Sequence, residues 1–293
     1  MKLLAPSYYK KFKCIADKCS HSCCIGWEID IDCKTHEKYA CLTGGYGEKI
    51  KESIEISDTP HFKLQKNDRC PHLNDQGLCN IITNLGEEYL CEICREHPRF
   101  YSFTSEGCEA GLGMACEEAC RIILSSDFDG NLIEIGEIDG EPDADEFDAL
   151  PLRQVAFDLL SLDIPYSECE KLLCDKVGVD PAYLNPTEWS ELLSSLEYLD
   201  TDHRELFLSN EGEFKCGDKE LKRALGYFVF RHCATALDQA DFCQSLCFSL
   251  LCVSIIRRVS SNIENTALAA RIVSEELEYS TDNTEAIKLC FDF

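Results

Sequence analysis

The stretch Lys13–Cys24 reads Lys-Cys-Ile-Ala-Asp-Lys-Cys-Ser-His-Ser-Cys-Cys and places four cysteines on one short loop. A second group, Cys70-x8-Cys79-x11-Cys91-x2-Cys94, follows after a long gap. Thiolates on short loops converge on one soft metal centre, usually zinc or an iron–sulfur cluster, because each loop holds two ligands within coordination reach. The spacing therefore predicts that the metal ligands are among nine cysteines: Cys14, Cys19, Cys23, Cys24, Cys70, Cys79, Cys91, Cys94 and Cys116.

Disulfide bonds explain this pattern less well. Cys23 and Cys24 are adjacent and do not easily bridge to each other, and the N-terminal residues contain no apolar run of the length of a secretory segment. Disulfide-dense secreted domains are also normally much shorter, and a chain of 293 residues can bury an ordinary core without such cross-links. We therefore interpret the cysteines as metal ligands in a cytoplasmic protein.

Composition narrows the class of partner. The chain is 45% hydrophobic and carries a net charge of −26, which is typical of a globular protein that repels phosphate backbones. Nucleic acid is therefore not expected as a partner, whereas a basic or lysine-bearing protein surface would be attracted. Solvation, or adaptation of the whole proteome to its environment, explains the acidic charge equally well. The longest apolar stretch, Ser245–Ile256, is too short to span a bilayer, so no membrane partner is expected.

Charge and composition together predict three regions. Residues 1–126 form a cysteine-rich metal- or cluster-binding domain, residues 127–148 an acidic connector and residues 149–293 a helical domain. The connector carries ten acidic residues, no basic residue and several turn-forming glycines. Residues 121–293 hold 14 Lys and Arg against 35 Asp and Glu, so most of the negative charge lies in the C-terminal half.

Apolar residues recur with a helical period throughout the C-terminal region. Proline is common at a helix start and glycine just after a helix end, so Pro165 and Gly178 define the two ends of one expected helix. The expected helices cover 152–162, 165–178, 186–196, 221–237, 242–259 and 267–277, and a further helix starts near Cys116. The predicted fold is mainly α: a cysteine-rich N-terminal metal-binding region with little β, followed by an all-α helical bundle. The cysteines within these helices (Cys233, Cys243, Cys247 and Cys252) are expected to be small core residues.

The segment Ile25–Asp32 alternates with period two, which predicts a strand. Its apolar face holds four residues, and its other face holds Glu28, Asp30 and Asp32. Such a face is either simply solvated or forms an acidic wall that orients a cationic amine. On the second interpretation Asp32 and Asp30 are the candidates for catalysis, as acceptors of a proton from the amine.

Two arginines follow the second cysteine group. Arg95 and Arg99 stand four residues apart beside Cys94, and Pro98 argues against a regular helix there. Arginines in this position offset the charge of a thiolate cluster or bind a carboxylate with two hydrogen bonds. We therefore predict that Arg95 and Arg99 contact a cofactor.

Six strings of residues in this chain resemble a known family, the flagellin lysine N-methylases. The similarity touches most of the chain, and its most specific motifs lie before residue 122. The strings that carry it are Phe12-x-Cys14-Ile15-x3-Cys19-x3-Cys23-Cys24-x-Gly26-Trp27-x-Ile29-x-Ile31-Asp32, Cys70-Pro71-x-Leu73-x3-Gly77-Leu78-Cys79-x-Ile81, Gly86-Glu87-x2-Leu90-Cys91-x2-Cys94-Arg95-x2-Pro98-Arg99, Cys116-x-Glu118-Ala119-x-Arg121, Tyr227-Phe228-Val229-Phe230-Arg231-His232 and Glu276-Leu277-Glu278-Tyr279-Ser280-x-Asp282-Asn283.

This resemblance implies an enzyme that transfers a methyl group from S-adenosylmethionine to lysine ε-amines of flagellin or another lysine-bearing protein. It also implies a [4Fe–4S] cluster held by four of the nine cysteines, with zinc as the alternative metal. Eight or nine thiolates also suffice for two centres, or for one cluster and a zinc ion. The chain shows no glycine-rich dinucleotide-type loop after a strand and no Cys-x3-Cys-x2-Cys run. The site of the methyl donor is therefore not located by the sequence. Two other functions stay open: a structural metal-binding protein, and an electron carrier without methyltransferase activity.

Overall fold

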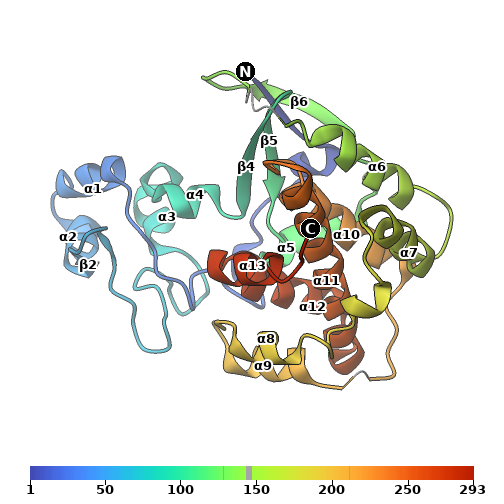
Figure 1. Cartoon of the computed structure of the whole chain (residues 1–293). Helices are drawn as coiled ribbons and strands as arrows, with labels where there is room; N and C mark the ends of the chain where they lie inside the picture. The colour runs from blue at the N-terminus through green and yellow to red at the C-terminus, as the bar shows by residue number, and fades with distance from the viewer. Residues whose placement is uncertain (128, 143–146, 211) are drawn as a thin grey trace. The chain divides into compact units, whose positions relative to one another are not determined.

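A computed structural model of the chain describes residues 1–127, 129–142, 147–210 and 212–293 (Figure 1). The internal contacts divide the chain into two compact units. Unit 1 comprises residues 1–12 and 100–293, and unit 2 comprises residues 13–99. The chain is about 52% helical and 11% strand, which confirms the predicted mainly α class.

A four-stranded sheet opens unit 1, with strand order β4-β5-β1-β6. Its strands are β1 (Lys2–Pro6), β4 (Arg99–Thr104), β5 (Gly107–Leu112) and β6 (Leu132–Glu137). β1 runs parallel to β5 and antiparallel to β6. Every residue of β5 is buried, whereas β6 is mostly exposed, as befits a strand at the sheet edge. Three of these strands lie before residue 126, in the region where the sequence predicted little β.

Helices make up the rest of unit 1 (Figure 1). They are α5 (Glu117–Ser125), α6 (Leu150–Leu160), α7 (Tyr166–Val177), α8 (Ser190–Ser195), α9 (Thr201–Leu208), α10 (Asp218–His232), α11 (Gln239–Ile263), α12 (Thr266–Val273) and α13 (Thr281–Lys288). Short 3-10 helices cover Ser7–Lys11 and Pro181–Leu184, and a π-helical turn, Ser274–Glu278, directly follows α12. The helices α10 and α12 pack along α11, and all three contribute to one large apolar core.

Helix α11 is the core helix of unit 1. By length and composition it could cross a membrane, contrary to the shorter apolar span expected from the sequence, but 89% of its most apolar window is buried inside the structure. Burial on all sides is the property of a central helix in a globular core. Cys247 and Cys252 lie on it with no solvent exposure, and Cys233 and Cys243 are also buried, which confirms them as core residues.

Side-chain caps explain where several of these helices begin. The carboxylate of Asp238 accepts the N–H of Asp241 at the start of α11, and α7 ends at Gly178, whose positive φ of 75° suits glycine. Helix α8 begins four residues later than expected. The side chain of Asn185 accepts the N–H of Thr187, and the resulting turns delay the helix until Ser190.

Unit 2 consists of short elements around a small core. Its helices are α1 (Cys33–Ala40), α2 (Gly45–Ser53), α3 (Asn80–Leu85) and α4 (Glu92–Glu96), with 3-10 helices at Ala16–Lys18 and Glu87–Tyr89. The strands β2 (Ile54–Glu55) and β3 (His61–Phe62) form a two-stranded sheet. The core buries Ile29, Ile31, Tyr39, Ile50, Ile54, Phe62, Leu73 and Ile81 together with Cys70 and Cys91.

The strand predicted for Ile25–Asp32 is not formed. The alternation in burial is present near its end, where Ile29 and Ile31 are buried and Asp30 is exposed. However, only isolated bridges pair this segment with its neighbours in the described part of unit 2, and the next residue already starts α1. The period-two pattern therefore reflects an extended segment lying on the core rather than a strand in a sheet.

The contacts also divide the chain at other places than the sequence predicted. The unit boundaries lie at residues 12 and 99 rather than at 126 and 148. Within the expected connector, β6 pairs with β1 over five residue pairs, with a shift in register between Leu3 and Leu4, and Leu132 and Ile135 are its half-buried residues. Residues 128 and 143–146 of the connector lie outside the described residues.

Candidate metal centre

Five of the nine predicted ligands come together in unit 2. They lie on four segments: the loop before Ile25, the segment that follows β3, the start of α3 and the α4 turn. Two of the thiols are buried and three are half-buried against the small core. We call these five residues the thiol group: Cys24, Cys70, Cys79, Cys91 and Cys94.

Electrostatic interactions show that these thiols converge. Each of the five interacts electrostatically with at least two others of the group. A hydrogen bond between the Cys91 and Cys94 thiols lowers the pKa of Cys91 and raises that of Cys94. Burial raises the pKa of Cys70 to about 12, whereas a hydrogen bond with Cys23 lowers the pKa of Cys24 to about 7. Converging thiols of this kind are the donor set that soft metals select, and a bound cation would hold them as thiolates.

The donor set fits both metals that the sequence left open. Four cysteine thiolates hold a structural zinc ion, and four cysteine thiolates also hold an iron–sulfur cluster. Five neighbouring thiols supply enough donors for either. The choice between the two metals therefore stays a prediction.

Asp32 organises the protein around the thiol group. Its two carboxylate oxygens accept the N–H groups of Thr35, at the start of α1, and of Glu92, at the start of α4, each at 2.9 Å. Burial raises the pKa of Asp32, but these N–H groups outweigh the burial, and the pKa ends below its usual range. One ionised carboxylate thus caps two helices, and the second of them carries Cys94. This geometry gives Asp32 a structural role, and catalysis by Asp32 stays a prediction.

Tyr39 provides a second support beside the thiol group. Its buried hydroxyl lies 3.6 Å from the Cys91 sulfur and donates to the carbonyl of Tyr89 at 2.6 Å. Because that hydroxyl proton is used by Tyr89, the Cys91 thiol is left as the donor to Tyr39 while it carries a proton. The hydroxyl thereby fixes the position of Cys91 in the core.

The other predicted site residues lie outside the thiol group. Asp30 is exposed and forms an isolated bridge with His61, so catalysis by Asp30 also stays a prediction. Arg95 contacts its neighbour Glu96 at 3.3 Å, and Arg99 donates to the Arg95 carbonyl. These contacts are local, and cofactor binding by the two arginines stays a prediction.

The four remaining predicted ligands are placed differently. Cys14 and Cys23 are exposed, and Cys23 shares a hydrogen bond with Cys24. Cys19 lies with its sulfur 2.7 Å from the carbonyl of His21. Cys116 belongs to unit 1, where it is the residue before α5.

Sequence reasoning gave no role to a buried polar network in unit 1. Glu278, at the end of the π-helical turn, lies 2.6 Å from His232 Nε2, 3.3 Å from Arg231 Nε and 2.9 Å from the Tyr227 hydroxyl that donates to it. The Arg231 guanidinium also lies 5.1 Å from the ring centroid of Tyr279. The sequence did carry a signal for this network. Its residues belong to the two C-terminal strings of the family resemblance, which begin at Tyr227 and Glu276. The two strings therefore contact each other in the structure.

This network makes stability depend on pH. Burial lowers the pKa of His232 from 6.5, although Glu278 opposes this, so folding favours the neutral imidazole. The unfolded chain therefore binds more protons, and the free energy of unfolding should fall as pH drops below about 6.5. Urea unfolding at pH 7 and pH 5.5 should show a smaller loss of stability for His232→Gln than for the unmodified chain. Equal losses in the two proteins would contradict this assignment.

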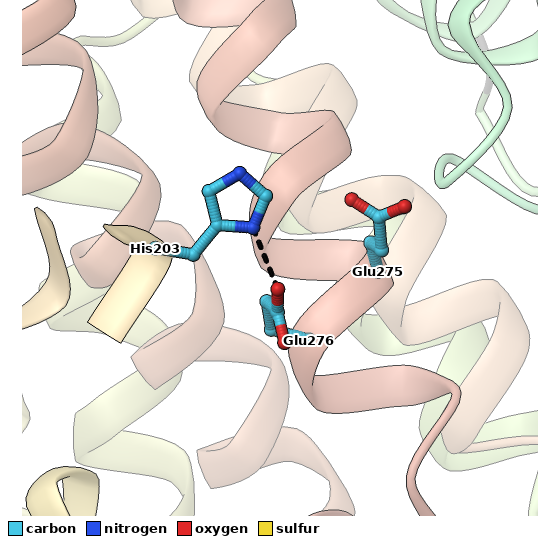
Figure 2. Close-up of side chains that lie close together, drawn as sticks. All are labelled: His203, Glu275 and Glu276. Carbon is cyan, nitrogen blue, oxygen red and sulfur yellow. Dashed lines mark hydrogen bonds and ion pairs between the residues drawn. The ribbon is translucent and has the colours of Figure 1, made fainter. Parts of the chain in front are cut away.

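A second group of acidic side chains lies at the same turn. Figure 2 shows His203 of α9 pointing at Glu276, with Glu275 beside it. Their ligand atoms lie within 4.8 Å of one another, but both carboxylates already have partners. Glu276 accepts from His203 at 2.6 Å and from the N–H of Leu199 at 2.7 Å, and Glu275 accepts from Arg271 at 2.6 Å. The group therefore ties α9 to the π-helical turn.

Known proteins resemble part of the chain. The flagellar biosynthetic protein FliU of Salmonella muenchen is 28% identical over 139 residues, which cover 45% of this chain and 80% of FliU. Lysine-N-methylases of Salmonella typhimurium and Salmonella choleraesuis are each 26% identical over 133 residues, or 41% of this chain. The match spans only 32% of the length of these two methylases. No protein-family model and no solved structure matches the chain.

These similarities show a distant relationship to lysine-N-methylases and to a flagellar protein. They confirm the family resemblance only as a distant relationship.

Proposed function

We propose that this protein methylates lysine ε-amines of a protein substrate, with S-adenosylmethionine as donor, and that its thiol group holds a [4Fe–4S] cluster. The observation that carries the proposal is the similarity to two proteins named lysine-N-methylase. The convergence of five thiols in unit 2 supports the cluster, because soft metal centres require such a donor set.

The thiol group offers more donors than one cluster needs. Cys91 and Cys70 are the most buried members, with exposed fractions of 0% and 5%, so we assign both as ligands. Cys24 and Cys79 come from separate segments and complete a set of four. Cys94, which is hydrogen-bonded to Cys91, is then the fifth thiol of the group. When bound, the cluster would supply a charged cross-link between four chain segments that otherwise share only a small core.

The reaction places modest demands on the protein. The lone pair of the lysine nitrogen attacks the methyl carbon, and the S–CH3 bond breaks so that the thioether leaves with the bonding electron pair. The ammonium product then gives a proton to a base. The protein must hold the amine neutral and in line with the sulfonium, and alignment of this kind is a major source of rate enhancement.

Charge supports a lysine-bearing substrate such as flagellin. The net charge of the chain is −26, and a balance of −21 falls within residues 121–293. An acidic surface attracts a basic protein segment and raises the rate of encounter, and salt weakens the attraction. The flagellar name of one relative points to flagellin as the first substrate to test.

The test is methyl transfer from labelled S-adenosylmethionine to purified flagellin by anaerobically purified protein of measured iron and sulfide content. We expect label on lysine residues of flagellin, and none when the donor is left out. A matched reaction with a lysine-rich protein unrelated to flagella tests substrate choice. A fully cluster-loaded protein that labels neither protein would refute the methylase and favour an electron carrier or a structural metal protein.

A further inference from the structure

Unit 2 contains a cavity of about 510 Å³ that none of the predicted site residues lines. Three charged side chains border it: Lys49 and Glu52 of α2, and Lys63, which follows β3. All three are exposed to solvent. The ammonium of Lys63 lies 3.3 Å from the carbonyl of Glu52. The cavity therefore combines two positive charges and one negative charge at its opening.

The inner wall of the cavity is a chain of hydrogen bonds through His72. This imidazole is 2% exposed, with Nδ1 at 2.7 Å from the Tyr46 hydroxyl and Nε2 at 3.0 Å from the Ser53 hydroxyl. Ser53 gives its single proton to the carbonyl of Ile50 at 2.6 Å, so the hydroxyl accepts from Nε2–H. Nδ1 then accepts from Tyr46. Every proton in this series of hydrogen bonds has one acceptor. The wall of the cavity is therefore uncharged and preformed.

The same wall borders the thiol group. His72 lies two residues after Cys70, and Asn80, which also lines the cavity, directly follows Cys79. Tyr46 interacts electrostatically with both of these thiols. A molecule bound in the cavity would therefore lie beside the segments that carry two of the proposed cluster ligands.

The lining suits a nucleoside joined to an amino acid. The lysine ammonium groups match the carboxylate of an α-amino acid, and Glu52 matches its ammonium. The amides of Gln65 and Asn80 and the ring of Tyr46 are groups that bind the edge and the face of a nucleobase. The cavity volume lies within the range of about 300–1,000 Å³ that is usual for small-molecule sites.

We propose that this cavity binds the methyl donor, S-adenosylmethionine, next to the thiolate centre. The proposal rests on the methylase function proposed above and adds the donor site that the sequence does not locate. The substrate lysine fits this cavity poorly, because its ammonium would meet two like charges and brings no negative group. The donor carries an ammonium and a sulfonium, but it also brings a carboxylate for the two lysines. Glu52 and the ring face of Tyr46 are the groups in the lining that attract its positive charges.

The test measures binding of labelled S-adenosylmethionine by equilibrium dialysis, using the full, metal-loaded chain under anaerobic conditions and without a protein substrate. The variants are Lys49→Glu, Lys63→Glu and their combination. Lys51→Glu is the matched control, because Lys51 lies on the same helix but contacts Glu48 and the Leu42 carbonyl instead of lining the cavity. Each cavity variant should raise Kd about tenfold, since each loses a charge-assisted hydrogen bond and gains a repulsion. The control should stay within about twofold.

The iron content of every variant should equal that of the unmodified chain, which shows that the fold is intact. If the unmodified chain binds the donor and the cavity variants bind it equally well, the donor site lies elsewhere and the methylase proposal is untouched. If the metal-loaded, unmodified chain does not bind the donor at all, both proposals are overturned.

Discussion

Replacing Cys91 by serine should remove most of the bound iron and sulfide from the protein. Cys91 has no solvent exposure and lies within the core of unit 2, where its thiol contacts Tyr39 and Cys94. A serine hydroxyl is a poor ligand for soft metals. Iron and acid-labile sulfide per chain, measured after anaerobic purification, should fall several-fold.

Loss of the metal centre in this variant should also unfold unit 2, while unit 1 stays folded. Metal binding to a structural thiolate site contributes about 10–16 kcal/mol in small zinc domains, and unit 2 has only a small apolar core to replace it. Limited proteolysis of the variant should therefore cut within residues 13–99 first. The large core of unit 1, built around α11, should protect residues 149–293.

Two control variants make the result specific. Cys33→Ser removes an exposed thiol of the same unit, and Cys247→Ala removes a buried thiol of unit 1. Both should keep full iron content. Iron loss of the same size in Cys33→Ser would show that any cysteine change in unit 2 disturbs the centre, and undiminished iron in Cys91→Ser would exclude Cys91 as a ligand.

The sequence predicted six helices of the C-terminal half, because local signals define them, but it did not predict α9 and α13. Pro165 and Gly178 mark the ends of α7, and the apolar run of α11 is unmistakable. The parallel pairing of β1 with β5 was missed, since its partners, Leu3 and Cys108, lie more than a hundred residues apart. No local pattern reports such a pairing.

The sequence predicted that cysteines form the candidate site, but it did not predict which of them lie close together. Spacing alone ranks Cys14 and Cys19 equal to Cys91 and Cys94, because all of them belong to close groups. The structure separates them, since a core residue such as Tyr39 can hold only those thiols whose segments pack against it. Convergence depends on these long-range contacts, which spacing does not encode.

The function of Asp32 illustrates the same limit. A carboxylate at the end of an alternating segment is consistent with catalysis, with solvation or with capping, and the sequence does not decide between them. The decisive contact is with the N–H of Glu92, sixty residues away. Cys33, the residue that follows Asp32, does not indicate that contact.

Removing the guanidinium of Arg153 should cost unit 1 about 3–5 kcal/mol of unfolding free energy. Arg153 of α6 donates two hydrogen bonds, of 2.6 and 2.7 Å, to the two carboxylate oxygens of Glu109 on β5. The two residues are 5% and 1% exposed, so Arg153→Ala leaves a buried carboxylate without its counter-charge. The chain has two tryptophans, and in a Trp27→Phe background the fluorescence of Trp189 reports urea unfolding of unit 1 alone.

The pair Arg121–Glu118 provides the matched control. It has the same two-bond geometry, at 2.7 and 2.6 Å, but the arginine side chain is 64% exposed. Water solvates its charges after either partner is removed, so Arg121→Ala should cost less than about 1 kcal/mol. The double variant Glu109→Gln/Arg153→Met should recover much of the loss, because it leaves no unpaired charge in the core. If Arg153→Ala costs no more than Arg121→Ala, the buried pair does not hold β5 against α6.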